Sequence, residues 1–190
     1  GTVLSIKSVT GSYSTSVTTG TDGSATLPAL PAGVYVVREE SVPEPYIVSN
    51  TEQTVALRPG KTSEVRFQDY QKPGLEILKK NIATGEPIEG VTFRIEPVDG
   101  SFSTSATTDG AGRIFLDSIP VGSYRITEKN VPSHVILSEI PQEIHLEAGC
   151  TRTVTFFNAV KPSLTILKRN SITGDYLANA KFHIYYGSDN

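Results

Sequence analysis

Leu-Glu-Ile-Leu-Lys-Lys, residues 75–80, is the stretch of sequence that decides the fold. Residues two apart in a β-strand lie on the same face, so Leu75, Ile77 and Lys79 share one face. Since the rest of that face is apolar, it predicts a core-facing strand with a lysine pointing inward. An isolated buried charge is too costly to keep. We therefore expect Lys79 to be paired, neutralised or consumed by chemistry.

Two other stretches end in the same way. Tyr-Arg-Ile-Thr-Glu places Glu128 at the end of an apolar face, and Val-Thr-Phe-Phe-Asn does the same for Asn158. If the three polar groups meet, one interpretation is a buried ion pair with an amide neighbour. The other is a cross-link: a desolvated Lys79 loses its charge readily and becomes a nucleophile. Glu128, carrying a proton, would then donate to the Asn158 carbonyl and relay the proton from Lys79 while ammonia leaves.

The chain repeats itself with a period of 168 − 79 = 89 residues, without a gap. For example, Pro-Ala-Gly-Val-Tyr at 31–35 matches Pro-Val-Gly-Ser-Tyr at 120–124. The Lys-Pro pairs at 72–73 and 161–162 place the boundaries, because proline cannot continue a strand ladder and stiffens a short linker. We predict repeat one at 1–73, lacking its first strand; a complete repeat two at 74–161; and the N-terminal fragment of repeat three at 162–190.

Repeat two reads as all-β, because its apolar residues alternate with polar ones and no useful helical period occurs. Turn signals rich in Gly, Asp and Pro separate the alternating runs. About seven short strands at this spacing predict a β-sandwich, and the period of the repeat predicts all-β, Ig-like sandwiches in a linear tandem array. The predicted strands are 75–80, 91–96, 101–107, 113–116, 123–128, 143–146 and 151–158.

Composition excludes several function classes. A net charge of −3 over 190 residues does not favour binding to nucleic acid or anionic membranes, and no apolar run is long enough to insert into a bilayer. The single cysteine, Cys150, cannot form an internal disulfide, and we interpret it as an incidental exposed thiol. Because the chain starts at Gly1 and contains no Met, we expect it to be a piece of a longer protein.

Other candidate sites are weak, and we expect neither a metal nor a cofactor. The three histidines have no metal-ligand spacing and no evident pairing to a serine or cysteine, so we interpret them as surface residues. They are His134, His145 and His183. The Asp-Gly pairs lack the alternating carboxylates of a calcium loop and are better interpreted as turns. They begin at Asp22, Asp99 and Asp109.

The motifs of repeat two together resemble a known family. They are Leu-x-Ile-x-Lys at 75–79, Thr-Gly-Glu-Pro-Ile-Glu-Gly-Val-Thr-Phe at 84–93, Thr-Asp-Gly-Ala-Gly-Arg-Ile at 108–114, Gly-Ser-Tyr-Arg-Ile-Thr-Glu-Lys-Asn-Val-Pro at 122–132 and Phe-Phe-Asn at 156–158. Five motifs in this order look like the CnaB-type (SpaA-like, prealbumin-like) repeats of Gram-positive surface adhesins and pilins. The resemblance implies a spontaneous isopeptide bond between Lys79 and Asn158, assisted by Glu128.

The resemblance also implies counterparts in the other repeats. Repeat one carries Glu39 and Asp69 at the matching positions, whereas its lysine would precede Gly1, and repeat three offers Lys168. An open sandwich exposes an apolar groove and unpaired backbone, which invites strand addition. We therefore expect head-to-tail association, in which 163–178 of one molecule completes repeat one of the next, with Asp69 and Lys168 able to become joined.

The leading functional interpretation is structural: covalently locked stalk repeats of an adhesin or pilus-like protein on the surface or cell wall of a Gram-positive bacterium. The alternative is a ligand-binding module that recognises a host protein or glycan through its loops; host matrix or glycan could also bind other parts of the parent protein. A turnover enzyme is disfavoured, because the bond-forming chemistry consumes its own residues.

Overall fold

Residues 75–80 lie in the central strand of a three-stranded sheet. The computed structural model describes residues 1–100, 103–185 and 187. In it β5 (Gly74–Asn81) lies between β11 (Thr151–Asn158), to which it is parallel, and β8 (Arg113–Leu116), to which it is antiparallel. Leu75 and Ile77 are fully buried. The alternation predicted from the sequence is therefore the alternation of burial along β5.

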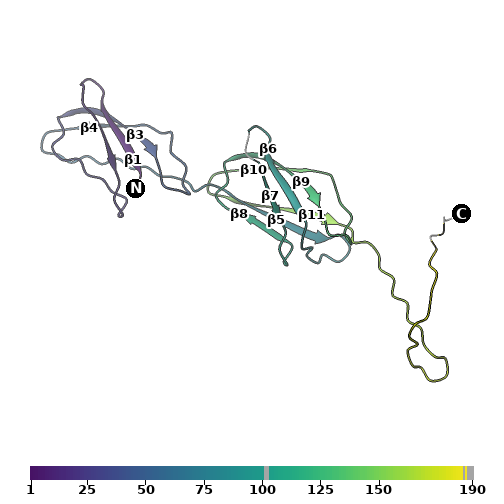
Figure 1. Ribbon diagram of the computed structural model, residues 1–190. Coiled ribbons are helices and arrows are strands. Elements are labelled where there is room, and N and C mark those ends of the chain that lie inside the picture. The colour runs from purple at the N-terminus through teal and green to yellow at the C-terminus, as the bar shows by residue number, and fades with distance from the viewer. Residues whose placement is uncertain (101–102, 186, 188–190) are drawn as a thin grey trace.

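The second sheet of repeat two is antiparallel throughout. Its strands run in the order β10 (Gln142–Leu146), β9 (Gly122–Asn130), β6 (Thr92–Pro97) and β7 (Thr104–Thr107). Apolar side chains of both sheets form one buried cluster, so the two sheets pack face to face as a sandwich. Figure 1 shows this sandwich as the middle part of the chain.

The all-β prediction is confirmed, and most strand bounds differ from the predicted ones by one or two residues. β8 and β11 have the predicted bounds. β7 begins at Thr104, whereas the prediction began at residue 101; residues 101 and 102 lie outside the described residues. No helix of the described residues is long and apolar enough to cross a membrane.

Repeat one contains one well-formed sheet. It consists of β2 (Ser14–Thr18), β1 (Val3–Ser8), β3 (Gly33–Ser41) and β4 (Gln53–Leu57), in that order and antiparallel. A shift of 89 residues maps these strands onto β7, β6, β9 and β10, in the same order across the sheet. A shared detail is the tyrosine hydroxyl that donates to a carbonyl four residues upstream: Tyr35 to Pro31 at 2.9 Å, and Tyr124 to Pro120 at 2.8 Å.

The counterparts of the other sheet are not strands in repeat one. By the same shift, 62–69 corresponds to β11 and 24–27 to β8, and neither segment is in a strand. In repeat two, β11 and β8 each form their ladder of backbone hydrogen bonds with β5. Because a strand needs a neighbour to pair its backbone groups, the segments 62–69 and 24–27 are without a ladder.

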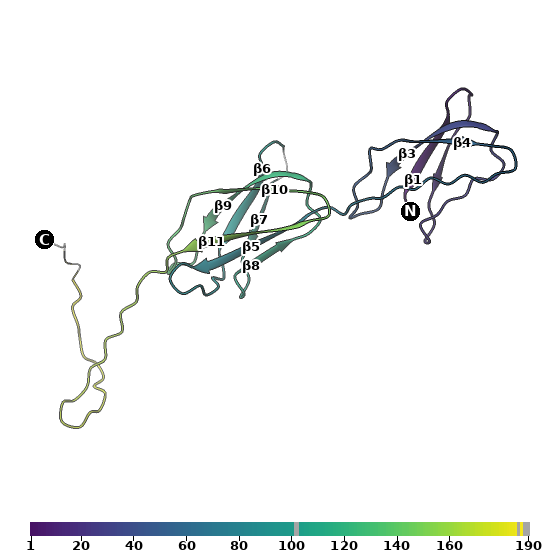
Figure 2. The same ribbon diagram turned by 180° about the vertical axis from the view of Figure 1, so that it is seen from behind.

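The repeats follow one another end to end. Figures 1 and 2 show the two repeats in a row, with the segment from residue 162 leaving repeat two at the end far from repeat one. At the junction, the Gly149 amide donates to the Gln71 carbonyl at 2.7 Å. The ring of Tyr70 packs against Gly149, where a Cβ atom would lie 3.2 Å from it. Thus the junction includes a direct contact between the turn before β11 and the end of repeat one.

Candidate functional site

Three polar side chains meet inside repeat two. Lys79 comes from β5, Asn158 from the neighbouring β11, and Glu128 from β9 in the opposite sheet. They are 1%, 3% and 2% exposed, respectively. Strand parity explains the position of each, since every one continues an apolar, core-facing row. The site therefore spans both sheets of the sandwich.

Glu128 contacts both of the other groups. Its Oε1 lies 3.1 Å from Lys79 Nζ. Asn158 Nδ2 donates to the same Oε1 at 2.7 Å and to Oε2 at 2.8 Å. The carboxylate is held in place by a third donor, the backbone amide of Ser138, at 2.8 Å from Oε2. One oxygen of Glu128 is thus within proton-transfer reach of an amine and of an amide nitrogen.

The arrangement differs from the predicted hydrogen bond. We expected a protonated Glu128 to donate to the Asn158 carbonyl, but the amide nitrogen of Asn158 faces the carboxylate instead. The amide nitrogen can only donate, and both oxygens of the Glu128 carboxyl group accept from it. As a result, Asn158 Oδ1 is buried without a hydrogen-bond partner among the described residues.

Within the part of the chain that the structure describes, Lys79 Nζ also has no hydrogen-bond partner. It lies at ion-pair distance from Glu128, but the angles of the contact are not those of a hydrogen bond. The rings of Phe93 and Phe156 each lie 5.9 Å from Nζ and keep water away from it. This burial lowers the pKa of Lys79 from its ordinary value of 10.5, and the neighbouring carboxylate of Glu128 only partly opposes the effect. The neutral, nucleophilic form of the amine is therefore easier to reach in this site than in water.

Repeat one holds the carboxylates of the equivalent site. Glu39 is 2% exposed and its Oε2 accepts from the Ser49 amide at 2.9 Å, as Glu128 does from Ser138. Asp69 Oδ1 is buried without a hydrogen-bond partner among the described residues. Burial raises the pKa of Glu39 from its ordinary value of 4.5; the Ser49 amide lowers it and the Asp69 carboxylate raises it further. Two acidic groups thus lie side by side here, and among the described residues no lysine forms an ion pair with either of them.

Lys168 is not brought to any of these groups. It is exposed, in a segment where the described residues form no strand and where the Lys168 carbonyl accepts from the Leu177 amide. That segment leaves the far end of repeat two (Figure 1), so the structure separates Lys168 from Glu39 and Asp69 of the same chain.

Sequence reasoning missed the groups that position the carboxylates. The backbone amides of Ser49 and Ser138 leave no side-chain signature, because any residue except proline offers the same donor. A weaker signal existed: both serines follow their glutamate by ten residues, at equivalent positions of the repeat. The two phenylalanines beside Lys79 were predicted only as core residues.

The other candidate residues do not form a catalytic constellation. The sequence showed no evident pairing of His145 to a serine, and in the structure His145 and Ser123 share a hydrogen bond of 3.0 Å. They lie directly opposite on β10 and β9, at an exposed position, so strand register accounts for the contact. Asp109 accepts from the amides of Ala111 and Arg113, as expected of a turn. Within the described residues, no group of three or more His, Cys, Asp or Glu could hold a metal ion.

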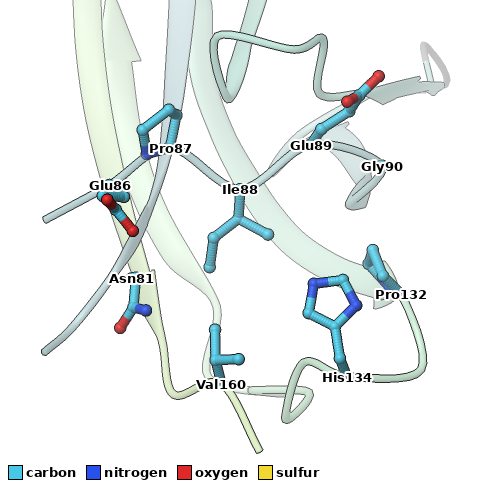
Figure 3. Close-up of a pocket in the computed structure, with 9 residues that line it drawn as sticks. All are labelled: Asn81, Glu86, Pro87, Ile88, Glu89, Gly90, Pro132, His134 and Val160. Carbon is cyan, nitrogen blue, oxygen red and sulfur yellow. The ribbon is translucent and has the colours of Figure 1, made fainter. Parts of the chain in front are cut away.

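A hollow of about 620 Å³ lies where the chain leaves repeat two (Figure 3). Ile88 and Val160 form its apolar part, and His134 lies beside Pro132. In Figure 3 the carboxylate of Glu89 points away from His134. The polar groups therefore do not converge as they would in a binding pocket with a defined ligand.

Comparison with known proteins supports the fold. Residues 1–71 and 73–160 each match the family model described as SpaA, a prealbumin-like fold domain. Among solved structures, a variant of the shaft pilin SpaA from Lactobacillus rhamnosus GG is 20% identical, with a TM-score of 0.51, over 87% of this chain and 95% of that one. No curated protein matches the chain.

Two further structures are similar at lower TM-scores. A minor pilin of Streptococcus agalactiae is 16% identical, with a TM-score of 0.45, over 89% of this chain and 87% of its own. The Bacillus anthracis TIE protein is 23% identical, with a TM-score of 0.46, over 85% of this chain. The chain spans 30% of that protein's length.

Proposed function

The chain belongs to the family of SpaA prealbumin-like fold domains, and from this premise we propose that its repeats are stalk domains of a bacterial adhesin or pilus-like protein, locked by internal isopeptide bonds. The observation that carries the proposal is the buried contact of Lys79, Glu128 and Asn158. A buried amine and a buried amide oxygen without hydrogen bonds are costly as free groups. Joining the amine to the side-chain carbonyl carbon removes the free, unpartnered amine.

The proposed reaction needs no cofactor. Neutral Lys79 Nζ attacks Cγ of Asn158, and the proton that it sheds passes to Glu128. The same carboxyl gives a proton to Nδ2, which leaves as ammonia. One C–N bond forms and one breaks, so atoms and charges balance. Glu128 suits the relay because Nζ and Nδ2 lie 3.1 Å and 2.7 Å from its Oε1. The reaction occurs once and consumes Lys79 and Asn158, so the domain is not a turnover enzyme.

Strand topology supports a mechanical role. β5 and β11 are the first and last strands of repeat two, and they are parallel neighbours. Tension that enters at Gly74 and leaves at Asn158 would therefore load this one strand pair in shear. With the bond in place, force passes from Gly74 along β5 to Lys79 and across to Asn158. The residues between 79 and 158 carry no load, which is the property that a stalk requires.

The proposed location is the outer surface or cell wall of a Gram-positive bacterium. The support is the family and the fold shared with the shaft pilin SpaA. Binding of a host matrix protein or glycan would then belong to other parts of a longer protein, since the hollow in Figure 3 does not gather polar groups around one point.

The test is the intact mass of the folded protein. We expect the mass to be lower than the sequence mass by one ammonia for repeat two, and Glu128→Ala to restore the ammonia while the sandwich still folds. Glu39→Gln is the matched control: it changes the equivalent carboxylate of repeat one and should leave the ammonia loss intact. A full sequence mass after prolonged folding near neutral pH would support the ion-pair interpretation instead.

A further inference from the structure

The motif Thr-Asp-Gly-Ala-Gly at 108–112 forms the connection between β7 and β8. Asp109 holds this turn together. Its Oδ1 accepts from the amides of Ala111 and Arg113, each at 2.9 Å. Its backbone carbonyl accepts from the Gly112 amide at 2.8 Å. The turn therefore has a conformation fixed by its own hydrogen bonds, and it can serve as a support for the segments that it contacts.

The turn contacts the backbone of Lys79. The Lys79 amide donates to the Gly112 carbonyl at 2.7 Å. Gly112 has a φ of +67°, in the left-handed region that favours glycine. A Cβ atom at this position would lie only 2.5 Å from the Lys79 carbonyl oxygen. Gly112 thus accepts a hydrogen bond from Lys79 and lies too close to it to carry a side chain.

A second segment holds the carbonyl of Lys79, which accepts from the Ile88 amide at 2.9 Å. Ile88 lies between β5 and β6, and Figure 3 shows it on the segment between Pro87 and Glu89. Thr108, which is 3% exposed, secures this segment. Its hydroxyl donates to the Ile88 carbonyl at 2.8 Å and accepts from the Val91 amide at 3.0 Å. The motif therefore supports Lys79 directly through its last residue and indirectly through its first.

These contacts matter because the ladder between β5 and β8 covers only 75–78. Lys79 is the next residue, so on this side of β5 Gly112 and Ile88 take over its backbone hydrogen bonds. The amine of Lys79 has to stay close to Glu128, whose Oε1 is 3.1 Å away. A misplacement of about 1 Å at a reacting group costs a factor of about 10² in rate. The two backbone contacts therefore bear on the reaction as well as on the fold.

Repeat one shares only part of the motif. Residues 19–23, which correspond to 108–112, read Thr-Gly-Thr-Asp-Gly, so only the first threonine and the last glycine are the same. The Thr19 hydroxyl again accepts from a backbone amide, at 2.9 Å, and Gly23 has a φ of +75°. Glycine replaces Asp109, whose side chain accepts from amides of its own turn. The two residues that reach outside the turn in repeat two are thus the two that the repeats share.

We propose that residues 108–112 position the nucleophile: Thr108 and Gly112 hold the backbone of Lys79 where its amine reaches Asn158. This role rests on the isopeptide bond proposed for repeat two, because a nucleophile requires positioning only if it reacts. Both residues act through the backbone of Lys79, so they are positioning residues and not catalytic ones.

The first test replaces Gly112 by alanine. The matched control is Gly85→Ala, because Gly85 has a similar φ of +75° but a Cβ atom there would meet open space. Each chain is collected in denaturant directly after synthesis, before the bond forms, and is then diluted to refold. Near-ultraviolet circular dichroism follows folding, and intact mass follows the loss of ammonia. We expect Gly112→Ala to fold but to lose ammonia roughly 10- to 100-fold more slowly, and Gly85→Ala to react at the wild-type rate.

Thr108 provides a second test that leaves the Gly112 contact in place. Thr108→Val retains the size of the side chain but removes the hydroxyl that secures Ile88. Thr108→Ser retains the hydroxyl and removes a methyl group. If Thr108 positions Lys79 through Ile88, valine should slow the loss of ammonia and serine should keep it close to the wild-type rate. A role in packing alone predicts the opposite order, because serine leaves a void at a buried site.

Hydrogen exchange tests the position of Lys79 independently of the reaction. The exchange rate of the Lys79 amide is measured in the Glu128→Ala background, in which no bond should form, so that cross-linking does not affect the rate. Adding Gly112→Ala should remove the protection of this amide, whereas adding Gly85→Ala should leave it in place.

The outcomes distinguish the positioning role from the proposed function. Wild-type rates of ammonia loss in both Gly112→Ala and Thr108→Val overturn the positioning role, and so does a Gly85→Ala chain that is slowed as much as Gly112→Ala. A wild-type chain that folds but keeps its ammonia contradicts the proposed function instead. In that case, unchanged protection of the Lys79 amide in Gly112→Ala also overturns the positioning of Lys79, whereas lost protection supports it.

Discussion

Replacing Lys79 by methionine isolates the contribution of the proposed cross-link. Methionine is unbranched and apolar, so it fills the space of the lysine stem between Phe93 and Phe156 without placing an amine beside Glu128. The variant cannot form the isopeptide bond. We expect it to fold, because Leu75 and Ile77 still anchor β5, but repeat two should unfold at a lower temperature.

The expected loss follows from the length of the closed loop. A bond between residues 79 and 158 closes a loop of 158 − 79 = 79 residues. The chain-entropy model used for disulfides gives about 4 to 5 kcal/mol of stabilisation for a loop of this length. At about 4 to 8 °C per kcal/mol for a domain of this size, Tm should fall by roughly 16 to 40 °C. Glu128, left buried without the nitrogen of Lys79 beside its Oε1, adds to the loss.

Calorimetry and intact mass should be measured on the same samples, because the two readouts must change together. The control is Lys80→Met, which removes the next lysine of β5, on the opposite face and not among the buried residues. We expect Lys80→Met to retain the ammonia loss and the high Tm. If Lys79→Met loses the bond and still has the Tm of the wild type, the cross-link does not stabilise the fold, and the argument from loop entropy fails.

Three further predictions concern single groups. Asn158→Asp should still form the bond but release water, which intact mass distinguishes from ammonia. Repeat one should lose stability as pH rises from the ordinary carboxyl value of 4.5 through the raised pKa of Glu39, because its folded state binds that proton more tightly. Thermal unfolding over this pH range should show the trend, and Glu39→Gln should flatten it. Tyr124→Phe removes the hydroxyl that donates to Pro120 and should cost about 0.5 to 1.5 kcal/mol in denaturant unfolding.

Strand parity was sufficient to predict which side chains enter the core. Lys79, Glu128 and Asn158 each continue an apolar row with a period of two, so their direction follows from local sequence alone. How they contact each other does not follow from parity. The amide of Asn158 turns its nitrogen toward the Glu128 oxygens, and the Ser138 amide is supplied by the backbone. Both depend on the packed site and not on a residue pattern.

Repeat one acts as an internal comparison for the origin of the strands. Residues 62–69 alternate as β11 does and 24–27 corresponds to β8, yet neither forms a strand. Local propensity is therefore insufficient here, and the backbone partners that β5 supplies in repeat two decide the outcome. The same strand carries Lys79. The amine can meet Glu128 and Asn158 only once β5 is seated against β11, so cross-linking must follow closure of the sandwich. A misregistered β5 would present its lysine to the wrong face, and the bond would then lock only the correctly paired state.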